Sequence, residues 1–106
     1  MAWLFLLLAG LFEIGWAVGL KYTAGFERLV PTLLTVGSMI ASLGLLGLSL
    51  KTLPIGTAYA IWTGIGTIGT VLFGIFVLDE PSNALRLLCV ALILAGIVGL
   101  KLVTPA

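Results

Sequence analysis

Four long apolar runs, separated by short polar interruptions, dominate the sequence. They cover residues 2–20, 31–50, 55–78 and 84–103, and each is close to the roughly 20 residues that an α-helix needs to cross a membrane. The runs are continuously apolar, whereas the strands of a membrane barrel alternate in polarity. The pattern therefore predicts an all-α membrane protein with four transmembrane helices. Because the interruptions are short, we expect residues 1–106 to form a single integral membrane domain.

Composition narrows the functional classes. Of 106 residues, 61% are hydrophobic and 8% are charged, against about 25% charged in soluble domains, so we do not expect a soluble enzyme. The net charge of +1 gives no basic footprint for nucleic acid. With no histidine and one cysteine, Cys89, we expect neither a metal site nor a cofactor. The first apolar run is long enough to span, and we expect it to be retained instead of cleaved as a signal peptide.

The cations near the ends of the runs are divided almost evenly between the two sides of the membrane. Lys21, Arg28 and Arg86 fall on one side, and Lys51 and Lys101 fall on the other. The positive-inside rule acts on this difference, and three against two is a weak bias. Lys101 can reach the headgroups by snorkelling. The distribution permits insertion in both orientations.

Small residues recur at intervals of four in the fourth run, at Ala91, Ala95 and Gly99. Such stripes let helix backbones approach closely. The contact can lie within one subunit or between subunits, and we expect this stripe to serve a subunit contact.

The third run is longer than a membrane requires. A straight helix over residues 55–78 would measure about 36 Å, so it must tilt, bend or protrude. Gly64 and Gly66 lie near its middle, where a kink costs least. A hinge at these glycines is one interpretation, and simple tilting is the other.

Glu13 is the one acid inside an apolar run, since Glu27, Asp79 and Glu80 all lie in interruptions. A charge at the centre of a membrane helix costs about 2.5 to 3.5 kcal/mol on insertion scales, so such a residue indicates a functional site. Burial disfavours the ionised carboxylate. No lysine or arginine shares its depth, so its charge must be balanced by a proton or a mobile cation. The sequence predicts a site where protons and cations compete for Glu13.

Aromatic and hydroxyl side chains occur at positions that can surround this acid. Trp16 is one turn along the same helix face, Tyr59 and Trp62 share a face of the third run, and Ser42 lies at similar depth. Aromatic rings attract cations, and hydroxyl groups accept N–H donors. The alternative is that the aromatic residues form an interfacial belt or core packing, and that Ser42 packs or bonds to its own helix.

The four short helices of a single copy of the chain offer little surface with which to enclose a solute. Secondary transporters often place their site between inverted repeats, and no internal duplication is evident here. Two copies in opposite orientations would form such a pair. A dimer of this kind would bring two Glu13 carboxylates into one site and couple their titrations.

The positions of Glu13 and Trp16, the segment KTLPIGTAYAIWTGIG at residues 51–66 and the segment ALILAGIVGLK at residues 91–101 resemble the small multidrug resistance family. The resemblance covers essentially the whole chain. Within that family, the chain resembles the guanidinium exporter subtype more than the subtype that exports quaternary ammonium cations. The features that carry this resemblance are Trp16, the segment TAYAIWTGIG and Lys101.

This resemblance implies a proton-coupled antiporter in the bacterial cytoplasmic (inner) membrane that exports guanidinium and small guanidinyl cations. It implies an antiparallel homodimer with dual topology, with Glu13 of both subunits binding substrate or protons. It also implies that Trp16, Ser42, Tyr59 and Trp62 form the hydrogen-bonding and aromatic surround.

Two other interpretations remain open at this point. An exporter of lipophilic quaternary ammonium cations would rely on cation–π contacts, because such substrates have no N–H donors. A non-transporting membrane assembly subunit could pair Glu13 with a cation of another protein.

Overall fold

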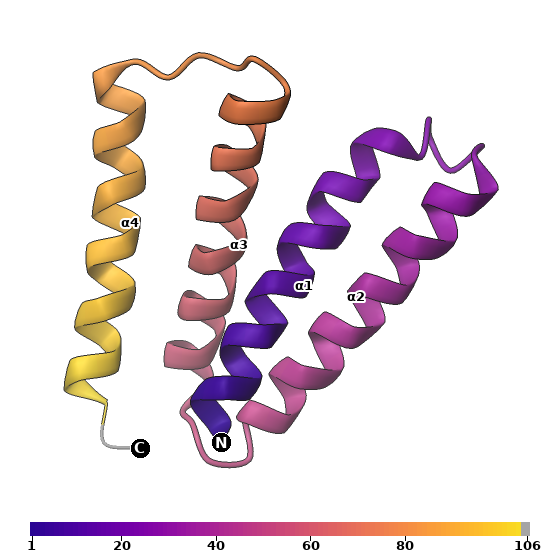
Figure 1. Cartoon of the computed structure of the whole chain (residues 1–106). Helices are drawn as coiled ribbons and strands as arrows, with labels where there is room; N and C mark the ends of the chain where they lie inside the picture. Colours follow the sequence, from indigo (N-terminus) through magenta and orange to yellow (C-terminus); the bar gives the residue numbers. More distant parts are fainter. Residues whose placement is uncertain (105–106) are drawn as a thin grey trace.

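The computed structural model describes residues 1–104. Within them the chain forms four α-helices and no strand: α1 (Ala2–Tyr22), α2 (Leu29–Ser49), α3 (Ile55–Val77) and α4 (Ala84–Val103) (Figure 1). Each helix is long and apolar enough to cross a membrane. The predicted all-α membrane fold is therefore confirmed.

The helix ends differ from the apolar runs by at most two residues, and local chemistry explains the differences. Helix α2 begins at Leu29, so Pro31 lies in its first turn, where a missing N–H costs nothing. The first intrahelical bond is donated by the N–H of Thr32 to Arg28 O, at 3.1 Å. Helix α4 is capped by Asn83, whose side chain accepts the backbone N–H of Arg86 at 2.8 Å.

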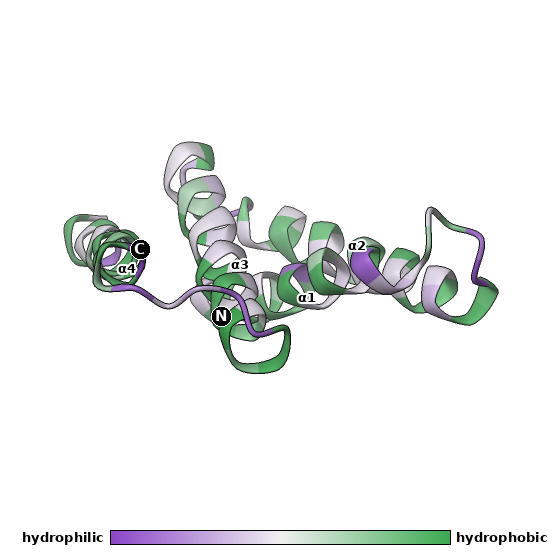
Figure 2. Cartoon of the chain, turned by 90° about the horizontal axis from the view of Figure 1, so that it is seen from above, coloured by the Kyte–Doolittle hydropathy of each residue, from purple (hydrophilic) through white to green (hydrophobic). Residues whose placement is uncertain are grey.

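The helices lie side by side in one layer, in the order α4, α3, α1, α2 (Figure 1). Seen from above, the layer is thin and α4 stands at its edge (Figure 2); the shortest extent of the backbone is 16 Å. The α1–α2 and α3–α4 connections share one end of the layer, and the start of α1 lies at the other. The two groups of cations noted above consequently lie at opposite ends.

Helix α1 packs between α2 and α3 through small residues. A Cβ added to Gly15 would lie 3.4 Å from Ser38 Oγ of α2, and Gly69 of α3 leaves room for Ile14 of α1. Missing side chains at these positions let the backbones approach closely. The buried apolar residues of this packing are Leu6, Ala9, Leu46, Leu53, Ala58, Ile61 and Trp62.

Helix α4 is the least covered element. Its backbone approaches α3 but neither α1 nor α2, within the described part of the chain. Ile97 of α4 packs over Gly64 of α3, yet no residue of α4 is buried. A Cβ at Gly96 or Gly99 would meet open space. The small-residue stripe of this helix is therefore uncovered in one subunit, and its role in a subunit contact stays a prediction.

Helix α3 runs without a break from Ile55 to Val77. A side chain at Gly64 would collide with Ile97, and a side chain at Gly66 would collide with Glu13. Both glycines therefore have a packing function in this structure. The hinge at Gly64 and Gly66 stays a prediction.

Candidate cation-binding site

Glu13 projects from the middle of α1 against the backbone of α3. Its carboxylate occupies the space that a side chain on Gly66 would fill. Glu13 Oε2 is buried and has no hydrogen-bond partner among the described residues. The glycine thus makes the seat for the acid, and the acid has an acceptor atom left over for a ligand.

A cavity of about 260 Å³ opens beside this seat, between α1 and α3. It is lined by Glu13, Ala17, Gly66, Thr67, Thr70 and Val71. The hydroxyl of Thr70 is buried and without a hydrogen-bond partner inside residues 1–104, whereas Thr67 Oγ1 donates to Thr63 O at 2.8 Å. The walls combine a carboxylate with hydroxyl oxygens, which suits a ligand that donates hydrogen bonds.

Two residues of the cavity wall, Thr67 and Thr70, were not among the predicted site residues. A signal for them exists in the sequence, because Thr63, Thr67 and Thr70 follow the spacing of one helix face. Their depth next to Glu13 also matches, but which helix face meets α1 is set by the packing of Gly66 and Gly69.

A second polar group lies one turn away along α1 and joins three helices. Ser42 of α2 donates to the carbonyl oxygen of Ala9 in α1 at 2.6 Å, and Trp62 Nε1 of α3 donates to Ser42 Oγ at 2.8 Å. Ser42 is fully buried and Trp62 is 7% exposed. The alternative that Ser42 bonds back to its own helix is wrong, since its acceptor belongs to α1. A hydroxyl has two lone pairs, so Ser42 can still accept one further N–H.

Tyr59 extends the Ser42–Trp62 group toward the outside of the subunit. Its ring lies 5.6 Å from that of Trp62, centroid to centroid, with 54° between the planes. This tilted geometry is favourable for aromatic pairs. The Tyr59 side chain is nevertheless 57% exposed, so one face of the pair is available to a ligand or to a second copy of the chain.

The structure thus brings together three of the five predicted site residues, Ser42, Tyr59 and Trp62. Glu13 lies in the neighbouring cavity between α1 and α3, one helical turn beyond Ala9. Trp16 has a buried indole Nε1 without a hydrogen-bond partner in the described part of the chain. Within one subunit, the predicted site is therefore divided between two adjacent regions. One contains Ser42, Tyr59 and Trp62, and the other contains Glu13.

Two of the fixed cations, Lys101 and Arg86, have partners of their own. The Lys101 ammonium lies 5.0 Å from the ring centroid of Trp3, and Arg86 pairs with Glu80 at 3.4 Å. No lysine or arginine of the described residues lines the Glu13 cavity. Residues 1–104 also contain no group of three or more His, Cys, Asp or Glu side chains that could hold a metal ion. No fixed positive charge among the described residues therefore balances the carboxylate within its own cavity.

Helices that can cross a membrane and a carboxylate at membrane depth define the class: an integral, multi-pass membrane protein with the features of a cation transporter. The chain belongs to the small multidrug resistance family, since residues 1–93 match the family profile described as Small Multidrug Resistance protein.

Relatives named guanidinium exporter match almost the whole chain. The guanidinium exporter of Proteus vulgaris is 59% identical over 102 residues, which are 96% of this chain and 98% of the relative. The guanidinium exporter of Salmonella typhimurium is 57% identical over 96% of this chain and 97% of its own. That of Escherichia coli strain K12 is 56% identical over 98% and 99%. With these bacterial relatives and its membrane-spanning helices, the chain is a multi-pass protein of the bacterial inner membrane.

Proposed function

We propose that this protein is a proton-coupled antiporter that exports guanidinium and small guanidinyl cations without chemically altering them. The observation that carries the proposal is the state of Glu13: a carboxylate seated on Gly66, with one oxygen buried and unpaired, beside a cavity lined by no lysine or arginine of the described chain. The relatives named guanidinium exporter support the substrate.

The polar groups match the chemistry of guanidinium. This cation is planar and donor-only, and its parallel N–H groups fit a carboxylate bidentately. Glu13 supplies the carboxylate, and Ser42 Oγ retains one lone pair for a further N–H. The hydrogen bond to Ser42 fixes the Trp62 ring, and the Tyr59 ring packs against it. Together the two rings offer an aromatic surface on which a planar cation can stack.

Antiport follows if the proton and the cation exclude each other at Glu13. Guanidinium keeps its charge at neutral pH and cannot cross the membrane by losing a proton. An inward proton gradient protonates the carboxylate on one side and drives the cation off it. Coupling requires that the empty, ionised site does not change sides, a state that burial in the membrane disfavours.

We further propose that the functional unit is an antiparallel homodimer. One subunit is a thin layer whose Tyr59 is exposed and whose α4 buries no residue. A second copy in the opposite orientation would cover these faces and bring Glu13 and Trp16 of one copy near the aromatic pair of the other. The three-to-two division of cations permits both orientations.

The test is guanidinium transport in proteoliposomes with an imposed pH gradient. We expect the wild type to accumulate guanidinium against its gradient and Glu13→Gln to lose this activity, while Glu27→Gln, an exposed loop carboxylate, serves as the matched control. Preference for a tetra-substituted ammonium over guanidinium would overturn the substrate. Equal transport by Glu13→Gln would overturn the mechanism.

A further inference from the structure

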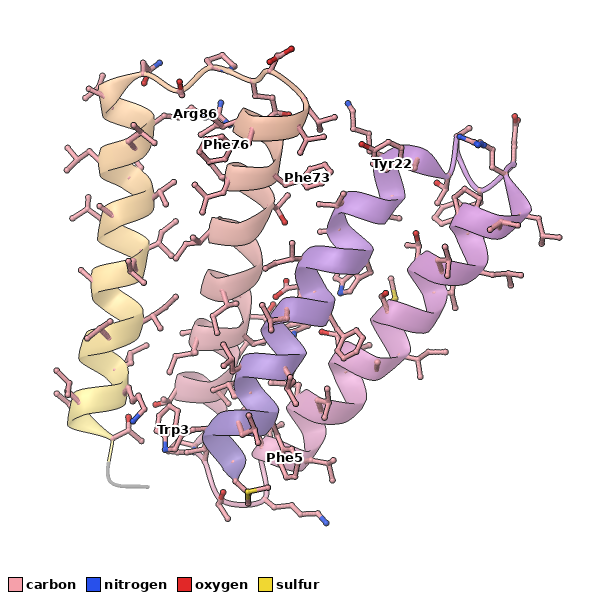
Figure 3. All side chains as sticks on the ribbon, in the orientation of Figure 1. Trp3, Phe5, Tyr22, Phe73, Phe76 and Arg86 are labelled. Carbon is pink, nitrogen blue, oxygen red and sulfur yellow. The ribbon has the colours of Figure 1, made fainter. Side chains whose placement is uncertain are left out.

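A second cavity lies at the end of the layer where α1 stops and the α3–α4 connection begins. Its volume is about 170 Å³, and its walls include Lys21 of α1, Phe73 of α3 and Glu80 of the connection. Figure 3 shows the Phe73 ring pointing from α3 into the space between α3 and α1. An acid and an aromatic ring therefore line the same cavity at this end of the layer.

This outer cavity adjoins the cavity of Glu13. Ala17, Thr70 and Val71 line both of them, so the two form one groove between α1 and α3. The groove begins at Glu80 and ends at Glu13. Along its length, the unpartnered hydroxyl of Thr70 is a hydrogen-bond acceptor common to both cavities.

The backbone fixes Glu80 at the mouth of the groove. Asp79 adopts a left-handed conformation, with φ of 55°, which is common just after a helix end. The chain then turns back, and the N–H of Glu80 donates to Gly74 O of α3 at 3.0 Å. The Glu80 carboxylate lies where a side chain on Gly74 would be. As with Glu13 and Gly66, a glycine of α3 makes the seat for an acid.

The Glu80 carboxylate already pairs with a guanidinium group, that of Arg86. Arg86 reaches from the first turn of α4 toward the end of α3 (Figure 3), and its Nη2 lies 3.4 Å from Glu80 Oε1. The side chains are 38% and 41% exposed, so the pair is a weak one that a solute can open. The head group of Arg86 is chemically the same as the proposed substrate.

From this geometry we infer that Glu80 is an outer binding station for the guanidinium cation on the route to Glu13. In the absence of substrate, the Arg86 side chain pairs with the Glu80 carboxylate and occupies this station. An incoming cation displaces Arg86, pairs with the Glu80 carboxylate and stacks on Phe73. Lys21, which also lines the outer cavity, opposes its entry electrostatically, and the Glu80 carboxylate favours it. The inference rests on the proposed function, because it concerns the same substrate.

The test compares variants in the proteoliposome assay, with KM and kcat for guanidinium measured separately. Glu80→Gln should raise KM about two- to fivefold, the worth of an exposed ion pair, with kcat little changed. Arg86→Gln should lower KM by a similar factor because it removes the internal competitor. The double variant should behave like Glu80→Gln alone, since Arg86 acts only through Glu80.

Glu27→Gln is the matched control, because it removes one carboxylate at the same end of the layer from an exposed loop position that does not line the groove. An unchanged KM in both Glu80→Gln and Arg86→Gln, or an equal shift in Glu27→Gln, would overturn the outer station. If Glu80→Gln fails to fold, the direction of the Arg86→Gln shift decides. A wild type that transports no guanidinium would instead defeat the proposed function itself.

Discussion

The Ser42–Trp62 group and the Glu13 cavity lie one helical turn apart, and their hydrogen bonding differs completely. Ser42 donates to Ala9 O at 2.6 Å, and Trp62 Nε1 donates to Ser42 Oγ at 2.8 Å, so both donors are satisfied. Glu13 Oε2, Trp16 Nε1 and Thr70 Oγ1 are also buried, yet none has a hydrogen-bond partner in the described chain. One region is complete within a single subunit, and the other is not.

This difference in hydrogen bonding indicates that the Ser42–Trp62 group stabilises the fold, whereas the Glu13 cavity is arranged for binding. A buried polar atom without a partner costs about 1 to 3 kcal/mol, and three such atoms would destabilise a purely structural core. They are understandable where a ligand or a second subunit completes them. Variants of the cavity should therefore reduce transport with little loss of stability, whereas variants of the Ser42 group should destabilise the protein as well.

Apart from the loss of transport expected for Glu13→Gln, the largest effect is expected from Gly66→Ala. The added methyl group would take the place of the Glu13 carboxylate and displace it, and a displacement of about 1 Å at a reacting group can cost on the order of 100-fold in rate. We expect guanidinium transport to fall at least about tenfold at nearly unchanged thermal stability. Gly56→Ala, where a Cβ meets open space, should retain activity; equal loss in both would remove the special role of Gly66.

Ser42→Ala should destabilise the protein in addition to any effect on transport. It strands the buried indole N–H of Trp62 and removes the bond to Ala9, which should lower the free energy of unfolding by about 1 kcal/mol, between typical values for hydrogen bonds in membrane proteins and for stranded donors. Thermal unfolding in detergent measures this. Ser38→Ala, one turn along the same helix face, is the control, and an equal loss there would mean that the Ser42 bonds contribute nothing specific.

Thr70→Val tests whether the unpartnered hydroxyl of the groove contacts the substrate. The substitution keeps the shape of the side chain and removes a polar atom without a partner, so stability should not fall. The KM for guanidinium should rise about two- to fivefold, the worth of one modest hydrogen bond. A drop in stability with an unchanged KM would place Thr70 with the structural groups instead.

The smallest effect is expected on stability from substitutions at Asp79, which lies outside both the Glu13 cavity and the Ser42–Trp62 group. Asp79 has a positive φ, which glycine adopts without strain. Asp79→Gly should therefore raise the free energy of unfolding by about 0.5 kcal/mol, and Asp79→Val should lower it. Thermal unfolding of both variants gives the scale of a pure backbone effect, and a destabilised Asp79→Gly would show that the Asp79 side chain itself is needed.

The helices of this fold could be predicted from the sequence almost completely. Hydrocarbon thickness sets the length of each run, and each helix begins and ends within two residues of the predicted run. The faces of the helices could not be predicted in the same way. Nearly every position is apolar, so polarity does not indicate which side of a helix meets another.

The site was predictable only in its residue types. Glu13 stands out as the single acid at depth, but its seat on Gly66 depends on how closely α1 and α3 approach. Ser42 finds an acceptor 33 positions away in sequence, and no local spacing indicates that pairing. The division between a completed group and an incomplete cavity likewise emerges only from the packing.

The central claim is that a proton and a guanidinium cation compete for Glu13. Proton release on guanidinium addition to the purified protein, followed with a pH-sensitive dye in weakly buffered detergent solution, tests it most directly. The account predicts release by the wild type over the pH range in which Glu13 is partly protonated, and none by Glu13→Gln. Guanidinium binding by the wild type without proton release across pH, or equal release by Glu13→Gln, would contradict it.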